Sequence, residues 1–346
     1  MNLKKIKNTY KTFKNDSNRK SNIIIIYEFI DLWIRHKEFP THYISRFLYR
    51  KEYINYRDFI PTKKYYKLIQ SEKIQNSFFG SILNNKLFFS FFCTDNDIRI
   101  PILTSYNYKR CFYLANQKYN IDSTSDLKIF FNKVFKVHKC NAIFIKSISG
   151  YGGTGIFFLQ KEYLDQQINV FGNKILSGSF IHQESVIQHR MINKIYAQSL
   201  NTIRFDVCNI DNQITVLGAV MRFGSMGSVI DNRSKGGFFI SIDDENGQLL
   251  KKGQKQMGYG GAELYKHPDT DFVFEGFKIP HYSQARNLAI EMSNLLPNKI
   301  VGWDIAITDQ GPLVIEGNDK SNITMTELQY GGYLKHPIIK KLLKTI

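Results

Sequence analysis

Two carboxylates and one amide, those of Asp304, Glu316 and Asn318, stand in runs rich in Trp, Ile, Val and Leu. Like charges directly opposite each other in a sheet are destabilising, and burying such a pair without a partner costs several kcal/mol. A hard divalent cation removes this conflict, because Mg²⁺ takes oxygen ligands of this kind. The alternative is an exposed pair of strands with both carboxylates in water. The residue types therefore leave a magnesium site and a solvated surface both open.

A predicted β-hairpin would bring these three residues together. Its strands are residues 301–308 and 312–318, joined by Asp-Gln-Gly. A three-residue loop that ends in glycine is a favoured hairpin connection, because its last position needs a positive φ. In the register set by this loop Asp304 faces Glu316, and Asn318 follows two residues later on the same face.

A glycine-rich segment, IKSISGYGGTGI, follows another predicted strand. Lys146 stands at the end of that strand, and Gly150, Gly152, Gly153 and Gly155 come next. The loop opens into IFFL rather than a helix and contains no Gly-Lys-Ser/Thr, so it indicates neither a Rossmann nor a Walker A site. Strand–loop–strand is the layout of a flap whose N–H groups cover phosphates, with Lys146 supplying positive charge; an ordinary glycine hairpin is the alternative. Beside a carboxylate pair suited to Mg²⁺, the loop favours a nucleotide site, and the kinase motifs HRD and DFG do not occur.

The chain is strongly basic, with a net charge of +17 over 346 residues and a pI of about 9.5. Its length predicts about two domains and a sizeable core. Its charge indicates anionic partners such as a nucleotide, an acidic glycan or acidic lipid. A general richness in Lys, Ile, Asn, Tyr and Phe is the alternative origin of this charge. No recognised motif supports a nucleic-acid partner.

Cysteines and apolar runs predict the location of the protein. The four cysteines lack CxxC spacing, which favours neither zinc nor a disulfide framework and indicates a reducing compartment. The run 23–34 is too short to span a bilayer and contains Glu28 and Asp31, and no cleavage site follows it. We therefore expect a soluble, cytoplasmic protein. The basic residues 1–20 would form either a solvated tail or an arm that contacts acidic headgroups on the inner face of the membrane.

The periodicity of apolar residues predicts mostly helical structure over residues 22–80 and α+β structure beyond them. Helices are expected over 84–92, 125–135 and 283–296, and strands over 100–104, 142–146, 156–159, 200–208 and 213–222.

Seven segments in a fixed order resemble the ATP-grasp superfamily, specifically its sugar-transfer-associated family, over about residues 84–319. They are NNKLFF with IPILTS, IKSISGYGGTGI, IHQESVIQHRMI, LNTIRFDV, GAVMRFGSMGSVIDNRSKGGFFISID, HPDTDFVFEGFKIP and VGWDIAITDQGPLVIEGN. The resemblance implies an α+β ATP-grasp fold, in which two α+β lobes clasp ATP, behind a mainly helical N-terminal segment. It divides the chain into residues 1–80, an N-terminal lobe over 81–182 that contains the flap, and a C-terminal lobe over 183–346 that contains the hairpin.

The resemblance also implies roles for single residues. Two lysines would contact the ATP phosphates, and residues 150–155 would cover the β- and γ-phosphates. The backbone of residues 183–187 would pair with the adenine edge. The cofactor-binding residues implied are Lys86, Lys146, Gly150, Gly152, Gly153, Gly155, Gln183, Glu184, Val186 and, as a ribose contact, Asn201. Asp304, Glu316 and Asn318 would hold one or two Mg²⁺ ions, and Lys320 would place a cation near the transferred group.

Two arginines on predicted strands have alternative roles. Strand alternation places Arg204 and Asp206 on one face, where the two side chains could simply pair. Alternatively, Arg204 and Arg222 clamp the γ-phosphate or an acylphosphate, because a guanidinium suits bidentate contacts with phosphate. Asp231 and Asn232, followed by two glycines, would form either part of an acceptor pocket or a surface loop.

The activity that the resemblance implies is ATP- and Mg²⁺-dependent ligation of a carboxylate to an amine or similar nucleophile through an acylphosphate. The protein would position the carboxylate and neutralise charge, and no covalent protein nucleophile is needed. The acceptor would be a small molecule or a glycan of acidic character, such as a cell-surface sugar or uronic acid. The alternatives are a phosphotransferase that acts on a sugar hydroxyl and a non-catalytic ATP-binding module of polysaccharide assembly.

Overall fold

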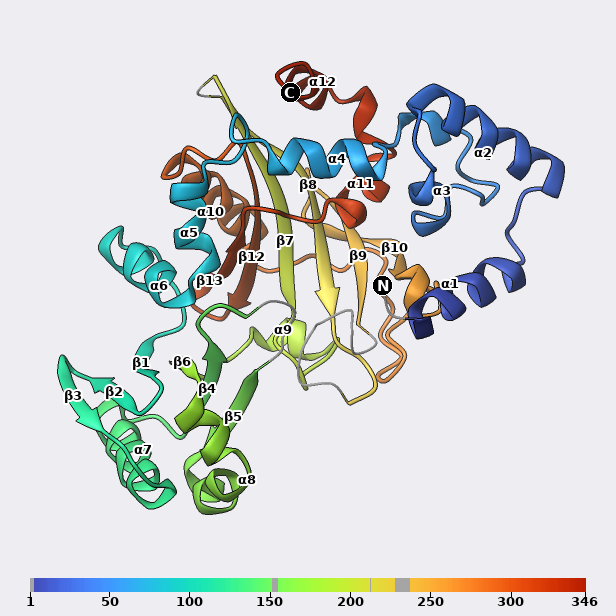
Figure 1. The fold of residues 1–346 in the computed structure, drawn as a ribbon. Coiled ribbons are helices and arrows are strands. Elements are labelled where there is room, and N and C mark those ends of the chain that lie inside the picture. Colours follow the sequence, from blue (N-terminus) through green and yellow to red (C-terminus); the bar gives the residue numbers. More distant parts are fainter. Residues whose placement is uncertain (1–2, 151–154, 212, 228–236) are drawn as a thin grey trace. The chain divides into compact units, whose positions relative to one another are not determined.

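The computed structural model describes residues 3–150, 155–211, 213–227 and 237–346 (Figure 1). The chain forms two compact units. The smaller unit consists of Ser81–Ile187 with Leu313–Glu316. The larger unit consists of Met1–Gly80, Gln188–Pro312 and Gly317–Ile346. Gly152 and Gly153 of the predicted flap, and Asp231 and Asn232 of the predicted acceptor segment, lie outside the described residues.

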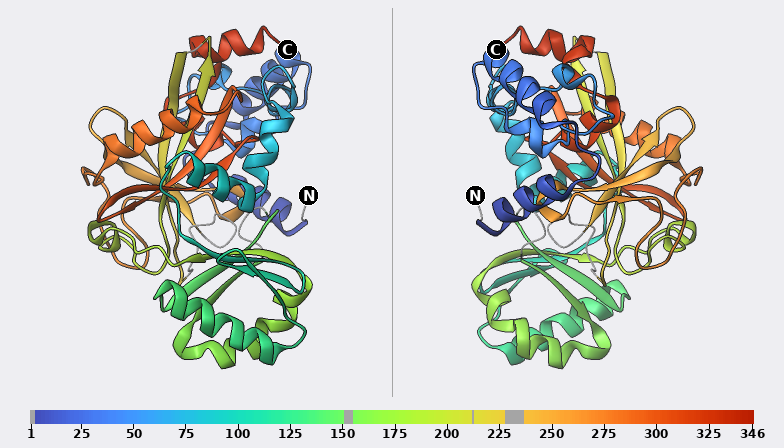
Figure 2. Two further views of the ribbon diagram at one scale, coloured as in Figure 1. Left: turned by 90° about the vertical axis from the view of Figure 1, so that its left-hand side faces the viewer. Right: turned by 90° about the vertical axis from the view of Figure 1, so that its right-hand side faces the viewer.

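The smaller unit contains a six-stranded antiparallel sheet with the strand order β3-β2-β1-β6-β4-β5. Helices α7 (Thr124–His138) and α8 (Leu164–Ser177) cover one face of it (Figure 2), and their apolar sides form the core with the inward side chains of the strands. The strands are β1 (Leu103–Tyr108), β2 (Cys111–Leu114), β3 (Gln117–Asn120), β4 (Ala142–Ser147), β5 (Ile156–Gln160) and β6 (Ser179–Glu184).

Local sequence sets the ends of the helices in this unit. Ser123 and Asp126 form a reciprocal capping box at the start of α7, and Lys139 ends it in the left-handed conformation. Asn85 is the N-cap of helix α6 (Lys86–Asp95), and its side chain accepts hydrogen bonds from the N–H groups of two residues in the first turn. This cap separates α6 from α5 (Ser77–Asn84). The single helix expected over 84–92 is therefore wrong at its start.

The larger unit is built on a seven-stranded sheet with the strand order β11-β10-β9-β8-β7-β12-β13. Helix α10 (Tyr282–Asn294) packs on one face, where Trp303 Nε1 donates to Ser293 Oγ. Helix α11 (Thr324–Tyr330) packs on the other face, where Thr326 Oγ1 donates to Asp206. The strands are β7 (Thr202–Ile210), β8 (Gln213–Phe223), β9 (Phe238–Asp243), β10 (Gln248–Lys255), β11 (Glu263–Leu264), β12 (Ile300–Thr308) and β13 (Gly311–Asn318).

The N-terminal residues add a helical layer to the larger unit, as expected from their periodicity. They join its C-terminal part through a buried ion pair between Arg46 and Glu327, whose carboxylate also accepts from the N–H of Ile60. The helices here are α1 (Leu3–Asn15), α2 (Asn22–His36), α3 (Thr41–Ser45) and α4 (Thr62–Gln70), and the later ones are α9 (Arg190–Asn193) and α12 (Pro337–Leu343). Short 3₁₀ turns are η1 (Tyr56–Asp58), η2 (Lys161–Tyr163), η4 (Met257–Tyr259) and η5 (Tyr333–Lys335).

The α+β fold class is confirmed by these two helix-covered antiparallel sheets. The strand expected over 100–104 starts later, at Leu103, because Pro101 has no N–H to give to a ladder. Among the described residues, no helix combines the length and the apolar character needed to cross a membrane. The division at residues 80 and 182 stays a prediction.

Candidate active site

In the smaller unit, the start of α6 is bonded to the beginning of the glycine-rich loop. The N–H of Lys86 donates to Ile148 O (2.9 Å), and its ammonium donates to Gly150 O (2.6 Å). The same loop returns at Gly155, whose φ is +70° and whose carbonyl accepts from the N–H of Ser147 (3.2 Å). A glycine takes this left-handed conformation without steric cost. Two of the predicted phosphate-binding elements, the lysine and the loop, are therefore adjacent.

Lys146 is the second predicted phosphate lysine, and it lies half-buried on β4. Its ammonium donates to Gln183 Oε1 on the neighbouring strand β6 (3.0 Å). Burial lowers its pKa from 10.5 to about 8, the carboxylate of Glu316 opposes this shift, and the charge of Lys86 adds to it. In the smaller unit, Lys86 and Glu316 thus both lie within electrostatic range of Lys146.

The end of β6 contains the first of the residues whose backbone is predicted to pair with an adenine edge. Gln183 is buried, and its Nε2 donates to Pro101 O (3.3 Å). The N–H of Glu184 donates to Ile102 O (2.9 Å) and that of Ser185 to Ala142 O (3.3 Å). Beyond this point Val186 makes no backbone hydrogen bond to any of the residues that the structure describes. A polar edge of the main chain is therefore available there.

In the larger unit, Arg204 and Asp304 are directly opposed on β7 and β12. Arg204 Nε donates to Asp304 Oδ1 (2.5 Å) and its Nη2 to Oδ2 (2.9 Å), and both residues are buried, with 5% and 0% of their surface exposed. Arg222, from β8, places Nη2 3.1 Å from Asp304 Oδ2 and donates to Thr202 Oγ1. One carboxylate therefore holds two guanidinium groups.

Asp206, the alternative partner for Arg204, has its own donors. Ser321 Oγ and Thr326 Oγ1 each donate to its carboxylate at 2.5 Å, and Arg204 Nη1 donates to Ser321 Oγ (3.2 Å). Burial raises the pKa of Asp206, and the charge of Arg204 opposes that rise. Ser321 approaches this closely because Gly302 has no Cβ, which would overlap its hydroxyl. The serine and threonine were not found from the sequence, since neither has a signal beyond proximity to the hairpin.

The side-chain oxygens predicted to bind Mg²⁺ are of the types that this ion prefers as ligands, but their surroundings in the structure differ from one another. The carboxylate of Asp304 has roughly four lone-pair sites, and three guanidinium N–H groups already point at them. A cation at Asp304 would therefore share this carboxylate with Arg204 and Arg222. The Nδ2 of Asn318 donates to Gly302 O (3.4 Å). This hydrogen bond involves the amide nitrogen, whereas a metal ion would bind the amide oxygen. Within the described part of the chain, no cluster of three or more His, Cys, Asp or Glu side chains is suited to a metal.

The remaining predicted residues differ in exposure. Asn201 is fully buried, and its side chain bonds Gln188, Ser199, the carbonyl of Tyr196 and the N–H of Gly224. These contacts hold the loop between α9 and β7, and the ribose contact stays a prediction. Lys320 is exposed, directly after the hairpin.

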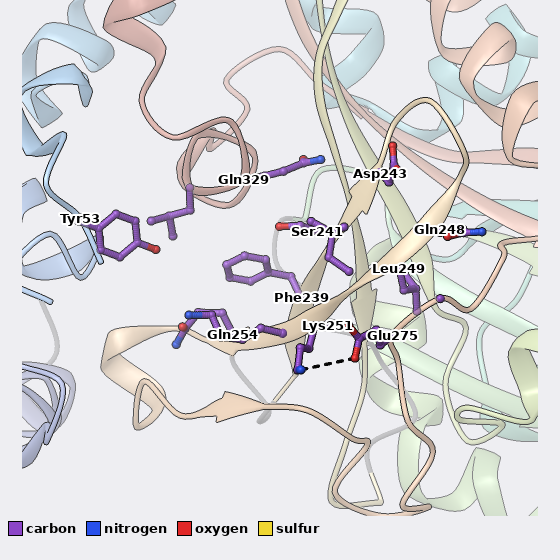
Figure 3. Close-up of a pocket in the computed structure, with 14 residues that line it drawn as sticks. Tyr53, Phe239, Ser241, Asp243, Gln248, Leu249, Lys251, Gln254, Glu275 and Gln329 are labelled. Carbon is purple, nitrogen blue, oxygen red and sulfur yellow. Dashed lines mark ion pairs between the residues drawn. The ribbon is translucent and has the colours of Figure 1, made fainter. Parts of the chain in front are cut away.

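A groove of about 600 Å³ lies on the same face of the larger sheet as the two arginines (Figure 3). Its residue Phe239, on β9, is directly opposite Arg222 on β8. Directly opposed residues lie roughly 5 Å apart, so the groove begins one strand beyond the arginine pair. Its other walls carry Tyr53, Gln329 and the ion pair of Lys251 with Glu275 (3.7 Å). None of the predicted site residues that the structure describes lines it.

Comparison with solved structures finds similar folds at low sequence identity. D-alanyl-alanine synthetase A from Vibrio cholerae is 11% identical, with a TM-score of 0.44 over 76% of this chain and 65% of that chain. Biotin carboxylase from Campylobacter jejuni, in a β,γ-ATP complex, is 10% identical, with a TM-score of 0.43 over 76% of this chain and 46% of that one. An ADP complex of N5-carboxyaminoimidazole ribonucleotide synthetase is 10% identical, with a TM-score of 0.41 over 70% and 46%. The chain thus spans less than two thirds of each of these proteins.

Comparison with families gives a specific match. No curated protein matches the chain. The model of the sugar-transfer associated ATP-grasp family matches residues 69–342, which is most of the chain. This match confirms the resemblance found in the sequence motifs and includes both lysines, the glycine-rich loop, the arginine pair and the hairpin. The chain therefore belongs to the sugar-transfer associated ATP-grasp family.

Proposed function

We propose that the chain is an ATP- and Mg²⁺-dependent ligase that joins a carboxylate to an amine or a similar nucleophile. The observation that carries this proposal is the placement of Lys86 and Lys146 at the glycine-rich loop of an ATP-grasp chain. Two ammonium groups and a row of loop N–H groups are what a triphosphate needs for charge neutralisation. The partial exposure of Val186, just beyond the end of β6, supports an adenine contact in the same unit.

The reaction proceeds in two steps, both of which need positive charge. A carboxylate oxygen of the substrate attacks the γ-phosphorus and ADP leaves, which gives an acylphosphate; the amine then attacks the carbonyl carbon and phosphate leaves. Arg204 and Arg222 stabilise the phosphoryl oxygens, because their guanidinium groups are held rigidly by Asp304 and Thr202. Mg²⁺ would be held by Glu316, Asn318 and Asp304 and would supply further neutralisation of the phosphate charge when bound.

The acceptor is proposed from the family and from the basic character of the chain. The family is associated with sugar transfer, so we propose a sugar or uronic acid of a cell-surface polysaccharide as one of the two substrates. The groove beside Arg222 offers hydroxyl, amide and aromatic side chains from Ser241, Gln248 and Tyr53, which are the groups that bind sugars. A location in the cytoplasm, where ATP is supplied, stays a prediction.

A thermal melt with ATP, with and without Mg²⁺, tests the proposal first. A ligand at a hundred times its Kd that binds only the folded state adds about 2.7 kcal/mol of stability, which raises Tm by roughly 4 °C in a chain of this size. We expect a Mg²⁺-dependent rise in the parent and a much smaller one in Lys146→Met. The absence of any shift with nucleotide would contradict the proposal. With ADP release as readout, an amide product supports the ligase, whereas a phosphorylated sugar without an amide would show a phosphotransferase.

The pH dependence of nucleotide binding should report the titration of Lys146. Its pKa of about 8 in the free protein lies below the unfolded value, so the ammonium loses its proton as pH rises through 8. Bound phosphates favour the charged form and raise this pKa, so binding should take up a proton above pH 8. Affinity should therefore be full below pH 8 and fall by up to about tenfold per pH unit above it.

Isothermal titration calorimetry at about pH 9, in two buffers that differ in ionisation enthalpy, measures this proton uptake directly. Lys146→Met removes the titrating group and should bind nucleotide without it. Lys133→Met is a matched control, since Lys133 lies exposed on α7 and donates to Tyr119 Oη. Equal proton uptake in the parent and in Lys146→Met would contradict the assignment.

A further inference from the structure

Helix α2 (Asn22–His36) presents a second apolar face to solvent. Residues at helical spacing along this face are all large and all exposed, from 47% for Ile30 to 82% for Ile23. We call these residues the apolar stripe; they are Ile23, Ile26, Tyr27, Ile30, Trp33 and Ile34. A surface helix of a globular protein normally turns charged and polar side chains outward, and a contiguous exposed apolar patch marks an interaction site.

The opposite face of α2 fixes the helix in the larger unit, so the apolar stripe is held outward. Ile25 and Leu32 are buried in the N-terminal core. Glu28, between them, accepts from Lys20 Nζ (2.7 and 2.9 Å) and from Tyr43 Oη (2.6 Å). Ser21 caps the start of the helix, and Lys37 ends it in the left-handed conformation. Neither rotation nor melting of α2 would hide the stripe without breaking these bonds.

The exposed stripe continues past the end of the helix. Phe39 is 56% exposed and packs edge-to-face against Trp33, with 5.7 Å between the ring centroids. Phe39 also packs edge-to-face against Phe29, with 5.1 Å between the ring centroids. Trp33 and Phe39 therefore form an aromatic end to the stripe, and such amphipathic rings are favoured at a membrane interface.

Cations surround this aromatic end. Lys37 is exposed beside it, and Lys63 and Lys64 open α4, which is tied to this region by the bond from Lys63 N to Glu38 Oε1 (3.1 Å). The charges of Lys64 and Arg35 both lower the pKa of His36, which places them near the last turn of α2. Residues 1–80 contain seventeen Lys and Arg against seven Asp and Glu, a net +10 of the +17 of the whole chain.

We propose that α2 and the cations around it dock this protein on an anionic lipid bilayer, with the helix flat in the interface. Its fifteen residues rise about 22 Å, less than the roughly 30 Å of a hydrocarbon core, so the helix lies in the surface and does not span it. The apolar stripe enters the boundary between headgroups and acyl chains, and the lysines contact the anionic headgroups. The right-hand view of Figure 2 looks onto this side of the larger unit, where α1 also lies.

The combination of charges and apolar groups favours lipid over other occupants. A second copy of the chain would cover the apolar stripe, but it has the same net charge of +17 and would not neutralise Lys37, Lys63 and Lys64. An acidic glycan would pair with the lysines and leave the isoleucines in water. An anionic bilayer satisfies both groups at once.

Fluorescence of Trp33 gives a direct test with the full chain. The sequence contains two tryptophans, and the other one, Trp303, is fully buried, so a change in emission on adding vesicles reports Trp33. We expect vesicles of phosphatidylcholine with phosphatidylglycerol to shift the emission to the blue, and vesicles of phosphatidylcholine alone to do so much less. Flotation of the protein with the same vesicles measures binding independently.

Paired variants separate the apolar and the charged contributions. Ile26→Glu with Ile30→Glu should weaken vesicle binding at least a hundredfold, since each isoleucine contributes about tenfold or more when buried. Lys63→Gln with Lys64→Gln should weaken binding to anionic vesicles by about fivefold per lysine and hardly change binding to neutral ones. Ile129→Glu with Val170→Glu is the matched control, because these residues are exposed on α7 and α8 of the smaller unit, and it should bind as the parent does.

Three outcomes would overturn the proposal. One is an unchanged emission and no flotation with anionic vesicles. Another is equal binding by the parent and Ile26→Glu/Ile30→Glu. The third is a dimer by light scattering that this variant abolishes, since a second copy would then cover the stripe. An unchanged circular dichroism spectrum of each variant establishes that a loss of binding is not a loss of fold.

Discussion

Replacing Asp304 by asparagine should lower the free energy of unfolding by about 3–5 kcal/mol, although the side chain keeps its shape. Both Asp304 and Arg204 are buried, and Arg222 also bonds the same carboxylate. Removal of one negative charge therefore leaves a buried cluster with two guanidinium groups and too little countercharge. We expect Tm to fall by roughly 4–7 °C, as measured by differential scanning calorimetry without nucleotide or metal.

A double-mutant cycle shows whether this loss arises from the ion pair. Arg204→Met in the Asp304→Asn background removes the stranded cation, so the double variant should be more stable than the sum of the two single losses predicts. Asp271→Asn is the matched control, because Asp271 pairs with Lys266 at 2.5 Å while both side chains are mostly exposed, and such a pair contributes about 1 kcal/mol or less. A loss for Asp304→Asn as small as that of the control would contradict the buried cluster.

Replacing Glu316 by glutamine should have the opposite profile, with little effect on stability and a loss of Mg²⁺-dependent ATP turnover of about a hundredfold or more. Glu316 is partly exposed on β13, so the neutral amide carries little desolvation cost. An amide is, however, a weaker ligand for Mg²⁺ than a carboxylate, and the charge that opposes the fall in the pKa of Lys146 is lost as well. ADP release and the rise in Tm on adding ATP with Mg²⁺ measure the two effects.

Asp309→Asn provides the control for this second variant. Asp309 lies in the loop of the same hairpin, where Oδ1 accepts from the N–H of Arg190 (3.3 Å), and an asparagine oxygen can accept the same bond. Turnover should be unchanged in that variant. Normal Mg²⁺-dependent turnover in Glu316→Gln would refute the metal assignment and leave the arginine pair as the source of phosphate stabilisation.

The hairpin could be predicted because its signals are local. Strands β12 and β13 are neighbours as expected, and Gly311 has a positive φ of +107°. The expected three-residue loop is wrong, however, because Gly311 already belongs to β13 and the loop consists of residues 309 and 310 alone. Thr308 Oγ1 also accepts from the N–H of Gln310 and donates to Gly311 O, and both hydrogen bonds stabilise the turn. The hairpin of β7 and β8 was predicted for the same reason.

The partner of Arg204 could not be predicted, because it depends on pairing between strands far apart in sequence. Local alternation offered Asp206, two residues along the same strand, but Asp304 lies directly opposite on β12. Opposed side chains are closer than those two residues apart on one strand, and the register of β7 against β12 is set by the assembled sheet. Ser321 and Thr326, which bond Asp206, enter the cluster for the same reason.

The helical character of residues 1–80 was predicted, but what these residues contact was not. Arg46 pairs with Glu327, Asn55 donates to Gly331 O, and Gln75 donates to Ile300 O and Asp319 O. Each of these bonds joins positions more than 220 residues apart. No periodicity or motif identifies the partners of such contacts.

The buried carboxylate of Glu327 has a consequence for how the protein is made. A ribosome adds about 5–20 residues per second, so roughly 15–60 s pass between the synthesis of Arg46 and that of Glu327. During that time Arg46 lacks its carboxylate partner and the N–H of Ile60 lacks its acceptor, although Arg46 can already donate to Ile60 O. The smaller unit, nearly continuous in sequence, can meanwhile fold on the nascent chain. The helices of residues 1–80 therefore gain their ion pair with Glu327 only after most of the larger unit has been synthesised.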